Sequence, residues 1–443
     1  MPDVRTASSS HFPQLMKTFF RLLLIIYGVC LAPQAFAQAW QIHDPDLHTF
    51  RMQTGEYATD FPVLRLNGTE RLEVSFDDLR HDYRRFTYRI EHVSADFQGN
   101  EGLFDSEYVA ASDTELPIEG YAQSMNTSVL YNHYAFFLPS ADMRPLLSGN
   151  YRLVISVEDD ETDEPRPAIT AYFAVNEEQA PISLHVDTDT DVDRDASHQQ
   201  VAVSVDCSGL GVRDAAQDVH IVVRQNGRYD NQVVRPRPTY QMGSTLRWEH
   251  CRELIFEAGN EYRKFEQTST RFPGLHVDRV RYVEPYYYAP LQRDLPRRNY
   301  LYEEDQNGRF VINCEQSGEP DTGGDYQYIL FNLEMPYLPD HELYVDGIWT
   351  GHQLSQPYRM EYNHEEGIYM LPVLLKEGYY SYQYLAVPKA DAATTDTTPT
   401  APTEGNFYQT ENRYDVFVYA RRPGERYDRL VGWRQTSYSI RNK

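Results

Sequence analysis

Apolar and polar residues alternate over short stretches of this chain, and turn signals separate the stretches. In NYRLVISVED, Tyr151, Leu153 and Ile155 fall on one face of the expected strand, and polar residues occupy most of the positions between them. The stretches TYRIEHV, VLYNHYAFFL and ITAYFAV predict further strands before residue 177. Strands this short, at a spacing of about eight to twelve residues, are typical of β-sandwiches. The pattern therefore predicts an all-β fold.

The expected strands form three groups, which predict three consecutive immunoglobulin-like β-sandwich domains. The second group contains Asn226-Gly227 between apolar flanks, a strong hairpin signal. We assign the last strands, in RYDVFVYARRPG and RYDRLVGWRQTSYSI, to the third domain. The predicted units are an N-terminal sandwich at 38–177, a middle sandwich at 178–285, a Tyr/Pro-rich crossing segment at 286–324, and a C-terminal domain at 325–443 with a mobile Pro/Thr/Ala-rich loop at 388–405.

Residues 1–37 are expected to be a leader and not part of the fold. Met16 is followed by an apolar run that ends in the cleavage pattern Ala-Phe-Ala at Ala37. The run is too short for a transmembrane helix. Cys30 follows Val29, where a lipidation signal favours a smaller residue, so export with cleavage after Ala37 is the prediction.

Composition agrees with β structure and narrows the class of partner. The chain has 35 Tyr, 20 Phe, 26 Pro and 24 Gly residues, which suit strands and turns. Its formal net charge of −25 argues against nucleic acid and against direct insertion into an anionic membrane. We expect a soluble exported protein that is a monomer when free.

The mature chain keeps three cysteines, which match no metal-binding spacing. Because the number is odd, at least one thiol stays free in a monomer. Cys207 and Cys251 could pair if their strands face each other. Buried thiols that pack as small apolar side chains are the simpler interpretation for these two and for Cys314.

The sequence contains none of the short catalytic motifs that mark a reaction class, and we predict no cofactor. There is no nucleophile elbow, phosphate-binding loop or dinucleotide fingerprint. His341-Glu342 and His364-Glu365 begin like a zinc-protease motif, but neither has a histidine at the fifth position. We therefore expect a protein that is not an enzyme.

The stretch DTDTDVDRD is the best metal candidate. Carboxylates at every second position resemble the ligands of a calcium loop. The glycine and the final glutamate of an EF-hand loop are missing, so a solvated acidic loop is the preferred interpretation. The candidate ligands are Asp187, Asp189, Asp191, Asp193 and Asp195.

The expected third domain resembles the immunoglobulin-like modules attached to glycogen-active enzymes. The stretches LYVDGIWTGH and YRMEYNHEEGIYMLPVLLKEGYYSYQYL have their order of strands and glycine-containing hairpins. Sugar-binding members use exposed tryptophans, and Trp349 is the only tryptophan in this region. The resemblance implies the fold, and it leaves an exported carbohydrate-binding protein of a glycan-uptake system as the alternative function.

Over the chain from about Trp40 onward, longer blocks resemble the plug protein family of the type IX secretion system. They are YRIEHVSADF with LFDSEYV, YNHYAFFLPSADMRPLLSGNYRLVI, and EGNFYQTENRYDVFVYARRPGERYDRLVG. The resemblance implies a periplasmic protein of three β-sandwiches. It also implies a large outer-membrane β-barrel translocon as the partner, whose periplasmic opening the plug closes when no cargo is exported.

Residues that could contact such a partner are aromatic side chains and arginines in predicted loops, which are the usual anchors of interfaces. Ordinary packing between domains, or a solvated charge, is the preferred interpretation of these residues. The stretch DMRPLLSGNYRLVI reads mainly as a structural corner, with Leu146-Leu147 buried and Ser148-Gly149-Asn150 as a turn. The candidate contact residues are Tyr286, Tyr287, Tyr288, Arg297, Arg298 and Arg144, with Arg421-Arg422 as further arginines.

Overall fold

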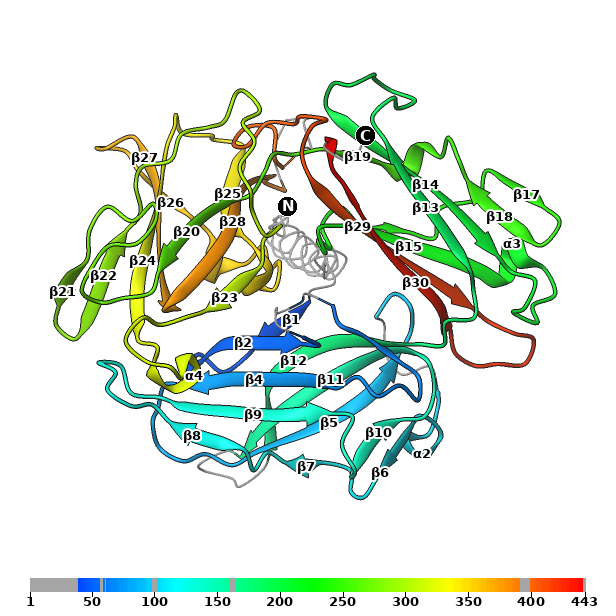
Figure 1. Ribbon diagram of the computed structural model, residues 1–443, viewed down its shortest axis with the longest axis horizontal. Coiled ribbons are helices and arrows are strands. Elements are labelled where there is room, and N and C mark those ends of the chain that lie inside the picture. The colour runs from blue at the N-terminus through cyan, green and yellow to red at the C-terminus, as the bar shows by residue number, and fades with distance from the viewer. Residues whose placement is uncertain are drawn as a thin grey trace, which may run out of the picture. The chain divides into compact units, whose positions relative to one another are not determined.

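The computed structural model describes residues 39–55, 59, 61–97, 102–158, 165–390 and 399–440. The predicted leader 1–37, with its cleavage site at Ala37, lies outside these residues, as does the part of the predicted mobile loop at 391–398. Gln38–Lys443 cluster as one compact unit. Its elements are almost entirely strands, so the predicted all-β fold is confirmed (Figure 1). No helix in the described part of the chain is long and apolar enough to cross a membrane.

The first sandwich consists of two facing sheets whose inner sides are aromatic. Phe76 packs edge-on against Phe86, with 5.0 Å between the ring centroids, and thereby joins the two sheets. One sheet contains β1 (Trp40–Ile42), β12 (Pro165–Asn176), β11 (Gly149–Glu158), β5 (Phe86–Val93) and β7 (Leu116–Pro117), with β3 (Val63–Arg65) beside β12. The other contains β2 (Leu47–Gln53), β4 (Leu72–Asp78), β9 (Asn132–Leu138) and β8 (Tyr121–Gln123). A small sheet pairs β10 (Met143–Pro145) with β6 (Val109–Ala111), which follows α2 (Asp105–Tyr108).

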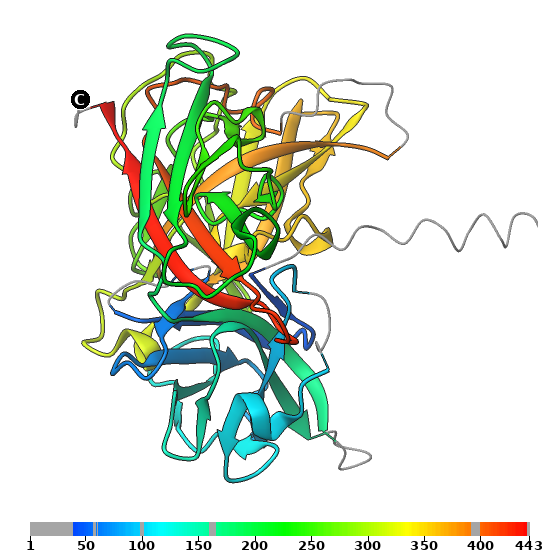
Figure 2. The ribbon, with the colours of Figure 1, turned by 90° about the vertical axis from the view of Figure 1, so that its right-hand side faces the viewer.

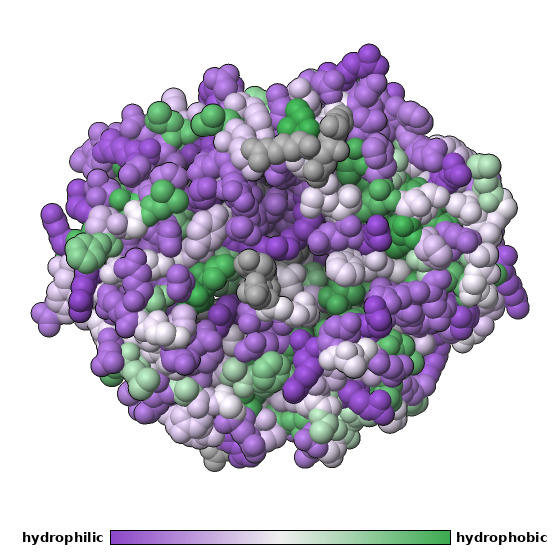
Figure 3. Space-filling view, in the orientation of Figure 1, coloured by the Kyte–Doolittle hydropathy of each residue, from purple (hydrophilic) through white to green (hydrophobic). Residues whose placement is uncertain are grey.

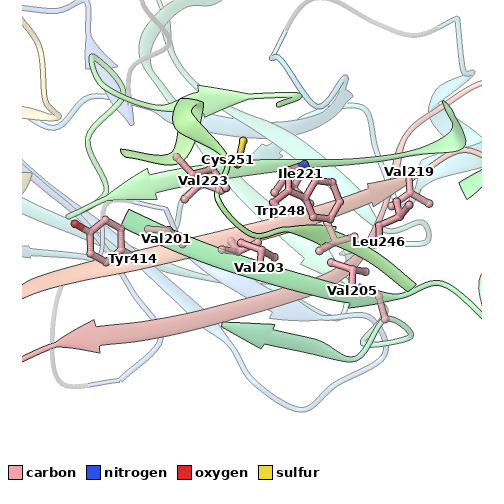
Figure 4. Packing of buried hydrophobic residues seen from close by; sticks show 14 of the residues in the cluster. Val201, Val203, Val205, Val219, Ile221, Val223, Leu246, Trp248, Cys251 and Tyr414 are labelled. Carbon is pink, nitrogen blue, oxygen red and sulfur yellow. The ribbon is translucent and has the colours of Figure 1, made fainter. Parts of the chain in front are cut away.

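The middle sandwich has a core of branched aliphatic residues around Trp248 (Figure 4). Val201, Val203 and Val205 alternate along one strand of this core, as the period of a strand requires. One sheet contains β13 (Ile182–Asp187), β14 (His198–Asp206), β18 (Thr245–Trp248) and β17 (Tyr240–Met242), with β19 (Ile255–Glu257) beside β14 and η1 (Arg252–Leu254) before it. The other contains β16 (Val233–Val234), β15 (Val219–Gln225), β29 (Asn412–Ala420) and β30 (Arg429–Tyr438), with α3 (Ala215–Asp218) before β15.

The two last strands belong to the middle sandwich. β29 pairs antiparallel with β15, from Val219 opposite Ala420 to Gln225 opposite Tyr414. Figures 1 and 2 show these red strands beside green strands of the middle sandwich. The assignment of the last strands to the third domain is therefore wrong. The physical reason is the shared core, because Val416 and Val418 pack with Ile221 and Trp248.

The third sandwich takes strands from the predicted middle domain and from the predicted crossing segment. Its core includes Phe265, Phe331, Trp349 and Tyr382. One sheet contains β20 (Arg263–Gln267), β28 (Gly378–Pro388) and β23 (Phe310–Ile312), with β25 (His341–Asp346) beside β28. The other contains β21 (Arg281–Val283), β22 (Tyr286–Pro290), β24 (Tyr326–Glu334), β27 (Ile368–Lys376) and β26 (Glu361–Asn363). Short helical turns are α4 (Pro320–Gly323), η2 (Ile348–Thr350) and η3 (Gln356–Tyr358).

A buried ion pair joins the first sandwich to the third. Lys376 Nζ donates to Asp77 Oδ2 at 2.7 Å, and Tyr326 Oη donates to the same oxygen at 2.6 Å. His133 Nδ1 lies 2.7 Å from Asp77 Oδ1. Burial alone would raise the pKa of Asp77, but Lys376 and His133 outweigh it and lower that pKa to about 2. The ionised carboxylate is therefore stabilised by groups on both sandwiches.

The chain between β28 and β29 joins the third sandwich to the middle one. Glu404 accepts hydrogen bonds from Arg263 Nε at 3.0 Å and from the Tyr384 amide at 2.9 Å. Two residues later, Asn406 Nδ2 donates to Glu257 Oε2 at 2.6 Å in the middle sandwich. Residue 404 is 1% exposed. The described end of the predicted mobile loop is thus packed, because its carboxylate pairs with a buried arginine.

Candidate partner-binding surface

The three consecutive tyrosines of the sequence lie on β22, between β21 and β24. Tyr288 is opposite Tyr328 in the parallel pairing of β22 with β24, and Tyr287 is opposite Gln327. Side chains alternate across a strand, so Tyr286 and Tyr288 share one face and Tyr287 points to the other. The structure therefore brings two of the three predicted tyrosines together.

The face that carries Tyr286 and Tyr288 points away from the core of the third sandwich. The inward positions of β24 and β27 supply core residues such as Ile329 and Leu371. Most outward positions in the middle of the same strands are also apolar or aromatic and at least partly exposed, whereas Asn332 on β24 is polar and buried. We call this surface the outer tyrosine face; its residues are Tyr286, Tyr288, Pro290, Tyr328, Leu330, Met370, Pro372 and Leu374.

Tyr328 lies at the centre of the outer tyrosine face. Its ring stacks on Tyr288 at 5.2 Å with an interplanar angle of 17°, and it meets Tyr286 edge-on at 5.1 Å. Partial burial and the two neighbouring phenols raise the pKa of Tyr328. The Tyr328 hydroxyl group therefore stays protonated near neutral pH. The three rings form an amphipathic platform suited to binding another surface.

Tyr287 contacts a different neighbour. Its ring lies 4.9 Å from that of Tyr282 on β21, and Tyr282 is 53% exposed. This second pair lies on the opposite side of the hairpin. Aromatic side chains are thus accessible on both sides of β21–β22.

The sequence analysis missed the members of the outer tyrosine face on β24 and β27. Their signal is present in the segments DYQYILFNL and IYMLPVLL, which are nearly continuous apolar runs without alternation. Such runs indicate strands with apolar residues on both faces. A search for strands without polar alternation would have found them.

Arg297 and Arg298, predicted as partner contacts, have different surroundings. Arg297 Nη2 lies 3.7 Å from Glu303 and its Nε lies 3.9 Å from Glu404, so it contributes to the packing of the third sandwich. Arg298 is exposed. The structure therefore leaves Arg298 accessible for a partner and gives Arg297 a structural role.

Arg144 lies on β10 of the first sandwich, away from the β22 sheet in the strand order. It is exposed and lines a pocket of about 300 Å³ together with Pro139, Pro145 and Val175. Leu146 beside it is 36% exposed, so the expected burial of this leucine is wrong. β10 pairs only with the short strand β6 in the described structure, which leaves this corner open.

The Ser148-Gly149-Asn150 turn joins the first sandwich to the middle one. Tyr419 Oη on β29 donates to Asn150 Oδ1 at 2.9 Å. Ser148 Oγ donates to Glu177 Oε1 at 2.6 Å, and Glu177 also pairs with Arg429 on β30 at 2.9 Å. The blocks that carry the family resemblance therefore meet at this turn.

Arg421 and Arg422 also take part in structural contacts. Arg421 Nε pairs with Asp428 Oδ1 at 3.0 Å, and Arg422 Nε donates to the Leu210 carbonyl oxygen at 2.8 Å. These bonds hold the hairpin between β29 and β30 against the middle sandwich.

The carboxylates of the acidic loop after β13 bind protein groups. Asp189 pairs with Arg194, and Asp193 Oδ2 lies 2.7 Å from His198 Nδ1. Asp191 Oδ1 lies 2.9 Å from His250 Nδ1. Among the described residues no cluster of histidine, cysteine, aspartate or glutamate is arranged to hold a metal ion. The loop is organised by its own ion pairs.

The cysteines and Trp349 are core residues. Cys207, Cys251 and Cys314 are buried free thiols, so the first two do not pair as a disulfide. Trp349 is 5% exposed, stacks on Phe331 at 5.7 Å, and donates its Nε1 hydrogen to the Ser381 carbonyl oxygen at 3.0 Å. The tryptophan of the segment that resembles the sugar-binding modules is therefore part of the core.

Comparisons with known proteins show which family the chain resembles. Residues 47–177 match the model of the type 9 secretion system plug protein 1st domain. A crystal structure of a hypothetical protein from Parabacteroides merdae is similar at 34% identity and a TM-score of 0.85, over 90% of this chain and 99% of that one. No curated protein matches the chain. The chain belongs to the type 9 secretion system plug protein family.

Proposed function

We propose that the protein is a non-enzymatic periplasmic plug subunit, which binds the periplasmic opening of the outer-membrane translocon barrel and closes it when no cargo is exported. The observation that carries the proposal is the match of residues 47–177 to the plug protein 1st domain. A plug is associated with the outer membrane only through its barrel partner.

The contacts between the sandwiches support a role as a plug. A plug for a wide opening has to be rigid, because sandwiches joined by flexible linkers would let ions and small solutes pass between them. Two contacts link sandwiches directly, namely the Asp77–Lys376 pair and the Asn150–Tyr419 hydrogen bond. The Glu404–Arg263 pair holds a connecting segment against the third sandwich. The three units can therefore act as one body.

Recovery of the partner from membranes tests the proposal. The mature protein, immobilised through a tag, is incubated with detergent-solubilised outer membranes of its host, and bound proteins are identified by mass spectrometry. We expect enrichment of a very large β-barrel subunit. Retention on an α-glucan column without any barrel partner would instead support the carbohydrate-binding alternative.

Permeability of the host tests closure separately from binding. Deleting the gene should increase uptake of small toxic solutes across the outer membrane, and expression of the protein should restore the barrier. Unchanged uptake in cells that contain the barrel would contradict closure even if the two proteins bind.

A further inference from the structure

The outer tyrosine face is unusual for the exposed side of a sandwich. An exposed sheet face normally carries polar residues between the inward apolar ones. In this case eight neighbouring outward positions on three strands are apolar or aromatic and at least partly exposed. Figure 3 shows a mostly hydrophilic surface with scattered hydrophobic residues on the side of the molecule that faces the viewer in Figure 1. A contiguous apolar patch of this kind marks an interaction site.

One end of the outer tyrosine face already takes part in an interface. Tyr326 and Lys376 stand at the ends of β24 and β27, on the same side as Tyr328 and Leu374, and they contact Asp77 of the first sandwich. Tyr326 also packs edge-on against Tyr131 at 5.4 Å. The exposed part of the face continues this interface outward. A bound partner would thus contact the third sandwich next to its joint with the first.

The other margins of the face carry charges. Arg293 lies 3.5 Å from Glu334 and 3.3 Å from Glu366 at the far ends of β24 and β26–β27. Arg281 on β21 is opposite Tyr288 and is exposed. An apolar centre with a polar margin is the usual arrangement of a protein–protein interface.

The segment that contains β21 and β22 has the opposite sign of charge to the whole chain, whereas the margin at β26 carries Glu361 opposite Met370. Three arginines of this segment pair with carboxylates, namely Arg279, Arg293 and Arg297. Residues 271–298 contain six arginines and three carboxylates, whereas the chain as a whole carries a net charge of −25. A negatively charged partner would be repelled by most of this protein and attracted to this segment. The charge distribution therefore favours one orientation of an acidic partner.

We propose that the outer tyrosine face binds an acidic protein surface, namely apolar side chains surrounded by carboxylates on the periplasmic rim of the barrel. This inference rests on the proposed function and adds the surface and the chemistry of its partner. Apolar contact with Tyr328 and Leu374 supplies the binding energy, and Arg281 supplies electrostatic attraction.

The test compares two variants on the face with two matched controls in the same pull-down from solubilised membranes. Leu374→Glu places a charge on the apolar face, at the end that adjoins the first sandwich, and Arg281→Glu reverses the charge at the margin. Met242→Glu, at a side chain that is 58% exposed in the middle sandwich, and Arg237→Glu, at another exposed arginine there, make the same charge changes elsewhere. Circular dichroism and thermal melting show that each variant is folded.

We expect Leu374→Glu to reduce the captured barrel by about tenfold or more, since it puts an uncompensated charge into the contact. Arg281→Glu should reduce capture several-fold and should weaken its dependence on salt. Both controls should capture as much barrel as the wild type. If Leu374→Glu fails to fold, Tyr288→Ser on the neighbouring strand takes its place.

Four other results would contradict the inference, and each of them identifies which statement fails. If the wild type captures no barrel, the proposed function and the inference both fail. If the wild type and Leu374→Glu capture equal amounts, only the inference fails. Wild-type binding to phosphatidylglycerol vesicles that Leu374→Glu abolishes would assign the face to the membrane surface. A dimer in sedimentation experiments that Leu374→Glu abolishes would assign it to a second copy of the chain.

Discussion

Gly149 shows how a single residue determines the contact between the first and middle sandwiches. Its φ is 128°, and a Cβ atom there would lie 2.5 Å from His92 Nε2 and 3.0 Å from the Asp428 carbonyl oxygen. Only glycine combines this backbone conformation with so close an approach. The turn therefore requires glycine for two independent reasons.

The variant Gly149→Ala should lower the free energy of unfolding by about 1–3 kcal/mol, because it adds both backbone strain and a clash. Urea denaturation followed by fluorescence measures this change. Gly243→Ala is the matched control, since that residue has φ 60° and open space around its Cβ position. Equal losses for the two variants would show that the close contact at Gly149 has no energetic effect.

Glu261 is a buried carboxylate whose ionisation opposes folding. Burial raises its pKa from 4.5 to about 7, although Tyr300 Oη donates a hydrogen bond to it at 2.7 Å. The folded protein therefore holds a proton that the unfolded chain releases at lower pH. Its stability should decline as the pH rises from about 4.5 to about 7.

Glu261→Gln removes this proton linkage and keeps an oxygen that can accept the Tyr300 hydrogen bond. At pH 8 we expect the variant to be more stable than the wild type by about 1–3 kcal/mol, since one pKa unit corresponds to about 1.4 kcal/mol. The difference should nearly vanish at pH 5. Chemical denaturation at the two pH values measures it, with Glu253→Gln at an exposed side chain as the control for losing one charge.

Among the strands, β29 and β30 have the clearest consequence for stability. They supply Val416, Val418 and Val431 to the same core that contains Cys207 and Cys251. Cys314 is buried elsewhere, with its thiol donating to the Gly323 carbonyl oxygen at 3.4 Å. The three thiols can thus report on the two sandwiches separately.

A chain truncated after Glu411 should expose the thiols of Cys207 and Cys251 to a thiol reagent without denaturant, while Cys314 stays protected. The full mature chain should show no rapidly reacting thiol, because all three are buried. The labelling reaction is quenched at successive times, and peptide mass spectrometry identifies the modified cysteines. Modification of Cys314 alone would contradict the placement of the last strands in the middle sandwich.

Periodicity in the sequence is enough to predict individual strands. It is not enough to predict which strands pair with each other in a sheet. The alternation in NYRLVISVED correctly predicts β11, and the family resemblance is confirmed. Which sheet receives β29 is a long-range choice that depends on core packing with Trp248 and Ile221, and local alternation carries no information about it. Of the surface, only the tyrosines of β22 were predicted, because the outward residues of β24 and β27 look like core residues until the sheet is known.

At the scale of the whole molecule, the Asp77–Lys376 pair couples the first and third sandwiches. Lys376 is 2% exposed, and Asp77 supplies its only carboxylate contact within 4.0 Å among the described residues. Asp77→Ala would remove the carboxylate that pairs directly with this buried ammonium group. Such losses cost about 3–5 kcal/mol.

Calorimetry should therefore show a lower midpoint for Asp77→Ala, with a transition for the first sandwich that separates from the rest. Asp189→Ala, which breaks an exposed ion pair with Arg194, should leave the midpoint unchanged. An unaltered single transition in Asp77→Ala would mean that the sandwiches are coupled by other contacts.

The pairing of β15 with β29 also sets the order in which the chain can fold. Val219 meets Ala420, and the whole third sandwich lies between them in sequence. When the chain is synthesised or exported with its N-terminus first, the third sandwich can complete its folding before β29 and β30 are available. The middle sandwich then still lacks half of one sheet. The middle sandwich, second in sequence, is therefore the last to close. Until the final thirty or so residues arrive, its valine-rich interior stays open, so a periplasmic chaperone would have its longest opportunity to bind there.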